Sequence, residues 1–403
     1  MLIVQKFGGT SVGDLERIGN VALRVSESKK AGNDIVVVVS AMSGETNKLV
    51  GYAEHFSSNP AQAEMDMLLS AGERVTASLL SIALQEMEHN ATAMTGRKAG
   101  ILTDKHHTKA RIQEINPKAM QDAIKAGKIV VVAGFQGVDE NGDVTTLGRG
   151  GSDLSAVAIA GALNADLCEI YTDVSGIYTT DPRIEPKAKK LDKISYDEML
   201  ELASLGAKVL QNRSVEMAKK LNVNLVTRTS FSNEEGTLIT KEENIMEAPL
   251  VSGIALDRNQ ARISLMGVKD RPGIASDIFN KLATAEVNVD MIIQNKAHDD
   301  TTNIDFTVPV GDLRDAKDIV DVFVKNGEIN ADSYNEDICK VSVVGVGMRS
   351  HTGVAARAFS TMADNNININ MISTSEIKIS MVIDEKYAEL AVRGLHDAYE
   401  LDK

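Results

Sequence analysis

The feature that most constrains the fold is a set of short, mostly apolar runs in the first half of the chain. They cover residues 2–7 (LIVQKF), 35–40 (IVVVVS), 129–133 (IVVVA) and 168–172 (CEIYT). Runs of this length and composition are typical of strands that are buried on both faces of a parallel sheet. We therefore expect a sheet that is covered by helices on both sides.

Helices are predicted between these strands. Apolar residues recur at helical spacing from Ile18 to Val25, Asp14 is placed to cap the helix start, and Gly32 is placed to end it. Further helices are expected over residues 62–87, 152–163 and 207–221, and after the capping box of Ser195 and Glu198. The alternation of strands and helices predicts an α/β fold, a sandwich with a mainly parallel sheet.

Length and composition limit the classes of protein. A chain of 403 residues exceeds what one hydrophobic core usually supports, so two or three domains are expected. The net charge of −14 and the absence of Trp argue against a nucleic-acid partner. No apolar run approaches the roughly 18 residues that span a bilayer, so we expect no membrane partner and a cytoplasmic location. Cys168 and Cys339 match no metal-ligand spacing and are expected to be reduced, buried thiols.

The first strand ends in a pattern that suits an anion. Lys6 is followed at once by Gly8, Gly9 and two hydroxyl residues, at the carboxyl edge of the sheet where open α/β folds bind ligands. Two glycines let backbone amides approach a phosphate, and the following helix adds the positive end of its dipole. The alternative is a tight glycine turn with a lysine that reaches solvent.

A second glycine cluster, residues 145–153 (TTLGRGGSD), also opens a helix. Arg149 offers a planar fork for a carboxylate, and Asp153 is suited to hold a nearby lysine. The signatures of P-loop enzymes and of protein kinases are absent from the sequence. Two glycine loops with cations predict a site where two anionic groups meet, and Lys208 adds a third cation at a predicted helix start.

The last third of the chain contains an internal repeat. The segment that begins at Ile263 (ISLMGVKDRPGIASDIFNKL) aligns with the segment that begins at Val341 (VSVVGVGMRSHTGVAARAFSTM), and each leads through an Asn-rich turn to a second strand. A charged segment, KEENIMEAP, precedes the repeat and is expected to be a linker. The alternative is a chance similarity between two amphipathic segments.

Six motifs in order give the chain a family resemblance. KFGGTSV, SAMSGETN, LLSAGERV, VTTLGRGGSD, TDVSGIYTTDPR and GAKVL, followed by the doubled module, resemble the aspartate kinases over essentially the whole chain. The resemblance implies an amino acid kinase fold, a three-layer αβα sandwich, in residues 1–240. It also implies two ferredoxin-like α+β ACT modules in residues 250–330 and 331–403, with residues 251–256 packing on the second module.

The resemblance also implies a reaction and its site. The γ-phosphoryl group of ATP, with Mg²⁺ held by the phosphates rather than by protein ligands, would pass to the side-chain carboxylate of L-aspartate. Lys6 and Asp153 would be catalytic, with Lys6 on the transferred group and Asp153 orienting the lysine. The aspartate-binding residues would be Thr46, Glu73, Arg149, Gly150, Gly151 and Ser152. The ATP-binding residues would be Lys6, Gly8, Gly9, Ser40, Thr172, Asp173, Tyr178, Arg183 and Lys208.

The repeated modules are expected to regulate the enzyme. Strand ends, glycine loops and helix starts can hold an amino-acid carboxylate, and Asp270 and Asp290 can hold its ammonium, whereas the second repeat lacks these acids. The resemblance implies feedback by lysine, threonine or both, and self-association through the modules. The predicted effector residues are Asp270, Asn288, Asp290 and Gln294, facing Ser375 and Glu376 of the other module.

Two alternatives remain open from the sequence. One is a kinase of the same fold acting on glutamate, acetylglutamate or a nucleotide monophosphate, and the other is an amino-acid sensor without catalytic activity. Met246 is placed where some relatives start a second, shorter chain. His106 and His107 are interpreted as structural, because neighbours on an extended strand point to opposite faces.

Overall fold

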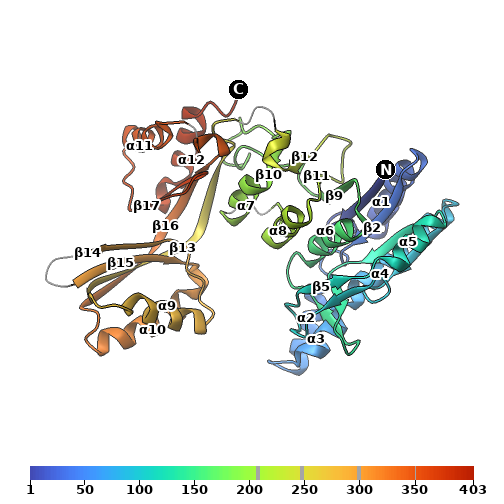
Figure 1. The fold of residues 1–403 in the computed structure, drawn as a ribbon, viewed down its shortest axis with the longest axis horizontal. Coiled ribbons are helices and arrows are strands. Elements are labelled where there is room, and N and C mark those ends of the chain that lie inside the picture. Colours follow the sequence, from blue (N-terminus) through green and yellow to red (C-terminus); the bar gives the residue numbers. More distant parts are fainter. Residues whose placement is uncertain (206–208, 246–248, 297–300, 350) are drawn as a thin grey trace. The chain divides into compact units, whose positions relative to one another are not determined.

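The computed structural model describes residues 1–205, 209–245, 249–296, 301–349 and 351–403. The described chain forms two compact units, which are treated separately here (Figure 1). The first contains residues 1–177, 190–203 and 209–245. The second contains residues 178–189, 204–205 and 249–403. Lys208 and Met246 lie outside the described residues.

The first unit is built on a sheet with the strand order β10-β12-β11-β9-β1-β2-β6-β3. Neighbouring strands run parallel, except that β12 is antiparallel to β11. The mainly parallel sheet is therefore confirmed. The strands are β1 (Leu2–Phe7), β2 (Asp34–Val39), β3 (Ala91–Met94), β6 (Ile129–Ala133), β9 (Leu167–Thr172), β10 (Lys193–Ser195), β11 (Leu225–Thr229) and β12 (Thr237–Thr240).

Helices cover both faces of this sheet, which makes three layers (Figure 1). Helices α1 and α4 pack together against one face, where Phe7, Val37 and Leu80 share a core, and α6 and α8 pack together on the other side. The helices are α1 (Leu15–Lys30), α2 (Glu45–Phe56), α3 (Gln62–Leu69), α4 (Ala71–Glu86), α5 (Lys118–Lys125), α6 (Gly151–Leu163), α7 (Tyr196–Ser204) and α8 (Asn212–Leu221).

The predicted helix caps are confirmed. The Asp14 side chain accepts a hydrogen bond of 2.8 Å from the Arg17 amide at the start of α1. At α7, the Ser195 amide donates to Glu198 Oε2 over 3.1 Å and the Glu198 amide donates to Ser195 Oγ over 3.2 Å. One boundary was wrong: residues 209–211 form a turn, and α8 begins only at Asn212.

A smaller sheet lies beside the main one and was not predicted. Its strand order is β5-β4-β7-β8, with β4 (Ile101–Thr103), β5 (Ile112–Ile115), β7 (Gln136–Val138) and β8 (Val144–Thr146). His106 and His107 lie in the turn between β4 and β5, so the reason given for leaving them structural was wrong. This small sheet positions the second glycine loop, because β8 ends only three residues before Arg149.

The second unit is one sheet with the order β14-β15-β13-β16-β18-β17. Its strands are β13 (Gly253–Lys269), β14 (Ile292–Lys296), β15 (Thr301–Val308), β16 (Ala331–Val344), β17 (Met371–Thr374) and β18 (Lys378–Asp384). Helices α9 (Ile274–Thr284) and α10 (Leu313–Lys325) pack side by side on the first repeat, and α11 (Val354–Asp364) and α12 (Ala388–Ala398) on the second (Figure 1).

The long central strand serves both repeats. Residues 253–257 of β13 pair with residues 340–344 of β16, and residues from Ala261 onward pair with β15. Val251 and Ile254 accordingly belong to the core of the second repeat. The start of the strand therefore extends the second module's sheet, as the resemblance implies.

Residues 178–189 also belong to the second unit. Ile184 packs on the core of the second repeat, and the Ile254 amide donates to the Thr179 carbonyl over 2.7 Å. The Thr179 hydroxyl lies 3.0 Å from Nε2 of the fully buried His396, and Arg393 Nε donates to the Ile184 carbonyl over 2.8 Å. A segment that follows β9 of the first unit is thus part of the second.

One helical stretch fits a membrane span by length and composition alone. Among the described residues, the helical stretch Gln62–Glu86 has a window of mean hydropathy 1.3, which is long and apolar enough to cross a bilayer. Half of that window is buried in the fold, and Ala77, Leu80 and Leu84 pack against the main sheet. The stretch corresponds to α3 and α4, whose apolar residues contribute to the core of the first unit.

We expect Leu80→Ala to destabilise the full chain by about 2–5 kcal/mol, because Leu80 is fully buried and its truncation leaves a cavity. Urea unfolding followed by circular dichroism measures this change. The control is Ile82→Ala on the same helix, where 61% of the side chain is exposed and the change should be within about 0.5 kcal/mol. Equal effects of both substitutions would contradict the packing of α4.

Candidate active site

A lysine and an aspartate meet at the carboxyl end of the central strand. Lys6 Nζ lies 2.6 Å from Asp153 Oδ1, and the two side chains are only 11% and 13% exposed. Successive side chains of a strand point to opposite faces, so Phe7 faces the core under α1 while Lys6 faces α6. Asp153 lies in the first turn of α6. The structure therefore brings the two predicted catalytic residues together, and their role in catalysis stays a prediction.

The first glycine loop leaves room for a ligand beside the lysine. A Cβ atom at Gly8 would lie 3.3 Å from Lys6 Nζ, and one at Gly9 would lie 3.2 Å from the Ala41 carbonyl oxygen. The Ser40 amide donates to the Phe7 carbonyl over 3.1 Å, which holds the ends of β1 and β2 together. Lys6, Gly8, Gly9 and Ser40 thus line one stretch of the sheet edge, and a side chain at either glycine would crowd it.

The second glycine loop is shaped by backbone conformations that favour glycine. Gly148 and Gly150 have φ values of 77° and 69°, in the left-handed region. Gly151 and Ser152 then begin α6 and are buried. Arg149 is exposed, and among the described residues no carboxylate pairs with its guanidinium. The loop can therefore offer backbone amides and a free cation to an anion.

Side chains at the start of α8 hold the backbone of this loop by hydrogen bonds. Arg213 Nη1 donates to the Leu147 carbonyl over 2.8 Å, and its Nη2 donates to the Ala110 carbonyl over 3.0 Å. The Gln211 side chain donates to the Arg149 carbonyl. The backbone of the loop is fixed in this way, while the Arg149 side chain stays exposed.

Glu73 is a buried carboxylate with one oxygen unused. It lies in the first turn of α4 and is 4% exposed. Its Oε1 accepts a hydrogen bond of 3.0 Å from the Ala41 amide, while its Oε2 is buried without a partner among the described residues. Burial raises the pKa of Glu73 to about 7, against the opposing effect of the Ala41 hydrogen bond. An unused carboxylate oxygen fits the ammonium group of an amino-acid ligand.

Gly72 explains how Glu73 reaches the loop after β2. A Cβ atom at Gly72 would lie 2.7 Å from the Ala41 Cβ, so only glycine lets α4 approach this closely. Thr46, the other residue predicted on this side, lies in the first turn of α2. Helix α2 begins after Gly44, which has a φ of 80°.

The predicted nucleotide residues fall into three groups. Thr172 ends β9, and its hydroxyl donates to the exposed Asp173 over 3.0 Å. Tyr178 and Arg183 belong to the second unit, where the 90%-exposed Arg183 forms a bidentate pair with Asp181. That pair lowers the pKa of Asp181 through the side-chain hydrogen bond. Lys208 lies outside the described residues, so its placement stays a prediction.

The predicted effector residues do not come together within one chain. Gln294 lies on β14 and Ser375 follows β17, and these strands form the two opposite edges of the sheet. Five strand spacings of about 4.8 Å put these edges on the order of 24 Å apart. In the first repeat, Asp270 and Asn288 are exposed, whereas Asp290 already pairs with the buried Lys340. Glu376 lies 3.4 Å from Arg349.

Two buried polar networks were not predicted from the sequence. Glu169 on β9 accepts hydrogen bonds from Gln5 over 2.7 Å and from Arg228 over 3.0 Å, which joins β9 to β1 and β11. Asp66 on α3 is fully buried and accepts hydrogen bonds from the turn 104–111 and from β8. Each acid is the single charge of a short apolar segment, LCEIYT for Glu169 and MDMLL for Asp66, and that signal was available.

Comparison with known proteins identifies the class. The chain matches the amino acid kinase family over residues 1–227 and ACT domains over residues 262–328 and 341–399. It is similar to the aspartokinase of Helicobacter pylori strain J99, with 58% identity over 407 residues and 100% of each chain covered. It is also similar to the aspartokinase of Pseudomonas aeruginosa, with 56% identity covering 100% of this chain and 98% of the relative.

Comparison with solved structures gives the same class of protein. Escherichia coli aspartokinase III in complex with aspartate and ADP is 26% identical, with a TM-score of 0.81 and 99% of each chain covered. The same enzyme in complex with lysine and aspartate gives a TM-score of 0.79 at 26% identity, over 98% of this chain and 99% of that one. The chain therefore belongs to the amino acid kinase family and, within it, to the aspartokinases.

The raised pKa of Glu73 predicts a pH dependence. Below pH about 7 the carboxyl group is protonated in the free protein and cannot pair with an ammonium, so affinity for an amino-acid ligand should fall as the pH drops through this value. NMR of the full chain with ¹³C-labelled glutamate should show one carboxyl signal that titrates near 7 and is missing in Glu73→Gln. A Glu73 signal with a midpoint near the ordinary 4.5 would contradict the description of the site.

Proposed function

We propose that the chain transfers the γ-phosphoryl group of ATP to the side-chain carboxylate of L-aspartate. The product is 4-phospho-L-aspartate, the entry to lysine, threonine and methionine synthesis. The observation that carries this proposal is the Lys6–Asp153 pair, at the same sheet edge as the unused oxygen of Glu73 and the Arg149 loop. Full-length identity to aspartokinases supports it.

The chemistry requires two anions to approach each other. Transfer of a phosphoryl group needs little covalent help from the protein, but it needs alignment and neutralisation of spreading negative charge. Lys6 provides a positive charge at the point where the phosphoryl group would pass, and Asp153 holds its ammonium in place. The amide of Gly9 and the amino end of α6 add fixed dipoles that need no rearrangement during the reaction. The Gly8 amide, which was also predicted as a phosphate donor, already donates to the Tyr171 carbonyl over 3.3 Å.

The acceptor would be held at both of its ends. Glu73 Oε2 is suited to the α-ammonium and Arg149 to a carboxylate, with Thr46, Gly150, Gly151 and Ser152 beside them. This arrangement leaves the side-chain carboxylate of the substrate free to face Lys6. Its attack forms a bond from a carboxylate oxygen to the γ-phosphorus, and the bond to the ADP oxygen breaks, so ADP leaves with the electron pair.

The nucleotide would lie along the first glycine loop and the end of β9. Ser40 follows β2, and Thr172 and Asp173 lie at the end of β9, so these residues lie on either side of the end of β1 in the first unit. Tyr178, Arg183 and Lys208 complete the proposed set. Mg²⁺, carried on the phosphates and keeping most of its waters, would neutralise part of their charge. We place the enzyme in the cytoplasm.

Regulation by lysine, threonine or both is part of the proposal. An effector changes activity only if it binds one arrangement of the protein better than another. Residues 178–189 carry two proposed ATP-binding residues and are hydrogen-bonded into the second repeat through Thr179, Ile184, His396 and Arg393. A shift of that repeat would therefore move Tyr178 and Arg183.

Self-association through the modules follows from the same geometry. The two halves of the proposed effector site lie on opposite edges of the sheet, near β14 and β17. The opposite-edge placement applies to Gln294 on β14 and Ser375 after β17, whereas Asp290 pairs with Lys340 on β16. A second copy of the chain could bring Ser375 and Glu376 of one sheet beside Gln294 of another. We therefore place the effector between chains.

The direct test is an ATP-consumption assay of the full chain with L-aspartate, L-glutamate or no acceptor, with hydroxylamine to trap an acyl phosphate. We expect trapping with aspartate only, and Lys6→Ala should lower turnover by at least about 100-fold while ATP affinity changes much less. The control is Lys29→Ala, which removes another Lys–Asp pair, at Asp34, before the amino end of β2. Trapping with glutamate, or with no acceptor at all, would contradict the assignment.

The contact between Thr179 and His396 predicts a second result. Burial lowers the pKa of His396, so its neutral ring can share a hydrogen bond with the Thr179 hydroxyl. Thr179→Val removes this contact and also the hydrogen bond of 3.0 Å that the hydroxyl accepts from the Lys189 amide. It should change the effector concentration for half inhibition by at least about 2- to 10-fold, with basal turnover kept. Thr361→Val removes a hydroxyl that bonds only within α11 and is the control. Identical inhibition curves for wild type and Thr179→Val would show that the contact between Thr179 and His396 does not transmit the effect of the inhibitor.

A further inference from the structure

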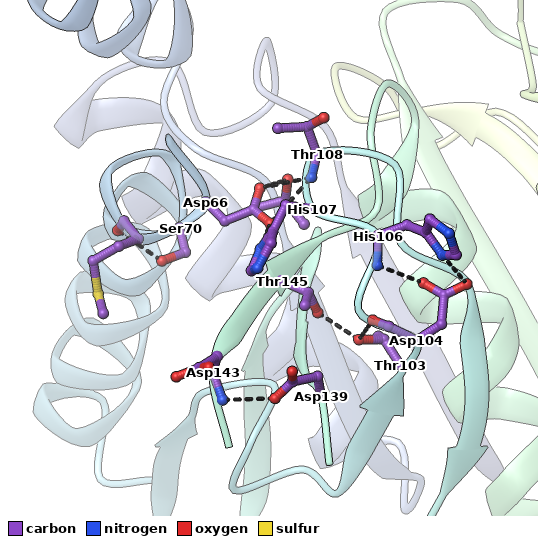
Figure 2. A network of polar contacts seen from close by, with 12 residues as sticks. Asp66, Ser70, Thr103, Asp104, His106, His107, Thr108, Asp139, Asp143 and Thr145 are labelled. Carbon is purple, nitrogen blue, oxygen red and sulfur yellow. Dashed lines mark hydrogen bonds and ion pairs between the residues drawn. The ribbon is translucent and has the colours of Figure 1, made fainter. Parts of the chain in front are cut away.

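The fully buried Asp66 gathers hydrogen bonds from two separate elements (Figure 2). Its carboxylate accepts 2.5 Å from the Thr146 hydroxyl on β8, and 3.0 and 3.1 Å from the Thr108 amide in the turn 104–111. His107 Nδ1 lies 2.8 Å from the same carboxylate. Burying a carboxylate is costly unless it is well paired, and here both oxygens are used.

The position of Asp66 in the chain connects it to the proposed ammonium site. Ser70 joins α3 to α4 with helical φ and ψ values of −62° and −13°, so the two helices run on as one. Glu73 lies seven residues beyond Asp66, which is two helical turns, or about 10 Å, along the same face. A shift of Asp66 along or about the helix axis would therefore carry Glu73 with it.

The partner of Asp66 leads to the other end of the proposed acceptor site. Thr146 is the last residue of β8 and lies three residues before Arg149. The turn with Thr108 also supports this loop, because a Cβ atom at Gly148 would lie 3.1 Å from the Thr108 carbonyl oxygen. Thr108 has a φ of 65°, a strained value for a β-branched residue, and the hydrogen bond of its amide to Asp66 helps to hold it there.

A second hydrogen bond also joins the α3–α4 helix to the small sheet, one helical turn beyond Asp66. Gln136 is the cross-strand partner of Thr146, and its side chain donates to the Ser70 carbonyl over 2.9 Å. Arg74 adds to the junction, with Nη2 2.8 Å from Ser70 Oγ and Nε 3.3 Å from Gln136 Oε1. The α3–α4 junction is thus fastened to β7 and β8 at positions 66 and 70, which lie four residues apart on one helix face.

We propose that Asp66 is a positioning residue for the amino-acid acceptor. Through Thr146 on one side and the α3–α4 helix on the other, it fixes the separation of Glu73 from Arg149. For the proposed substrate, that separation has to suit the span between the α-ammonium and a carboxylate. The inference rests on the proposed function, because Glu73 and Arg149 are taken to hold aspartate. Asp66 itself touches no reacting atom.

The test is steady-state kinetics of the full chain, with L-aspartate and ATP varied separately, on Asp66→Asn. An amide has one acceptor oxygen and places a donor against the Thr108 amide or His107, so the contacts cannot all be kept. We expect KM for aspartate to rise about tenfold or more with KM for ATP within about twofold, since small displacements of positioning groups are costly. Thr146→Val should also raise KM for aspartate. Thr146→Ser, which keeps the hydroxyl, should have the KM of wild type.

Asp104→Asn is the matched control (Figure 2). Asp104 also pairs with an imidazole, His106 Nδ1 at 3.1 Å, and accepts the amides of His106 and Arg111, but these contacts stay inside the turn. Its KM values should equal those of wild type.

Three outcomes would overturn the proposal. They are a lower melting temperature of Asp66→Asn with unchanged KM for aspartate, equal rises of both KM values, or the same effect from Asp104→Asn. If Asp66→Asn does not fold, the pair Thr146→Val and Thr146→Ser decides, because rescue by serine requires the hydroxyl contact. A wild-type chain without aspartate-dependent turnover would instead refute the proposed function. Calorimetric titration with aspartate then still tests whether Asp66 positions a bound amino acid.

Discussion

The ion pair between Lys6 and Asp153 is the interaction on which the site depends. Removing an ammonium and a carboxylate from water costs several kcal/mol per ion, and mutual attraction offsets this only when the geometry is good. The pair is 2.6 Å apart and largely buried at the end of the central strand. Without Asp153, Lys6 would be an unpaired charge beside Cys168 and other buried groups of the sheet. The fold therefore places a fixed positive charge two residues before Gly8, the start of the first glycine loop.

The proposed binding site for the amino-acid acceptor depends instead on rigid placement of its side chains and loop. Glu73 is held by the Ala41 amide and by the close approach that Gly72 allows, so its unused oxygen has a fixed position. The Arg149 loop is held by Arg213 from one side and by the network around Asp66 from the other. Strong positioning of this kind reduces the entropy that binding and alignment of the substrate must overcome.

Much of the first unit was predictable because its signals are local. The strands at residues 2–7 and 129–133, the cap at Asp14 and the capping box at Ser195 depend on neighbours in sequence. The proximity of Lys6 to Asp153 could be anticipated, because Lys6 lies near the carboxyl end of a strand and Asp153 lies at the start of a helix after a glycine loop at the same edge of the sheet. The role of Asp66 could not, since its hydrogen bonds join it to residues 42 and 80 positions away. The small sheet could not either, since it is closed by the pairing of Leu102 with Val138, which no local pattern indicates.

In the second unit, too, features that depend on residues far apart in the sequence could not be predicted. The repeat revealed two modules, but not that β13 would run for 17 residues through both, nor that residues 178–189 would pack with the second. The motif TDVSGIYTTDPR indicates a nucleotide loop through its donors and acceptors, whereas its fixation by His396 depends on a residue more than 200 positions away. Opposite placement of the two effector half-sites likewise follows from strand order, which no single segment encodes.

The central claim is that one sheet edge holds a nucleotide and an amino acid close together by fixed charges. A crystal structure of the full chain with L-aspartate and a non-hydrolysable ATP analogue tests it most directly. The account predicts Lys6 Nζ within hydrogen-bond distance of the terminal phosphate and Glu73 Oε2 against the ammonium of aspartate. An analogue bound away from Lys6, or aspartate bound with its ammonium far from Glu73, would contradict it.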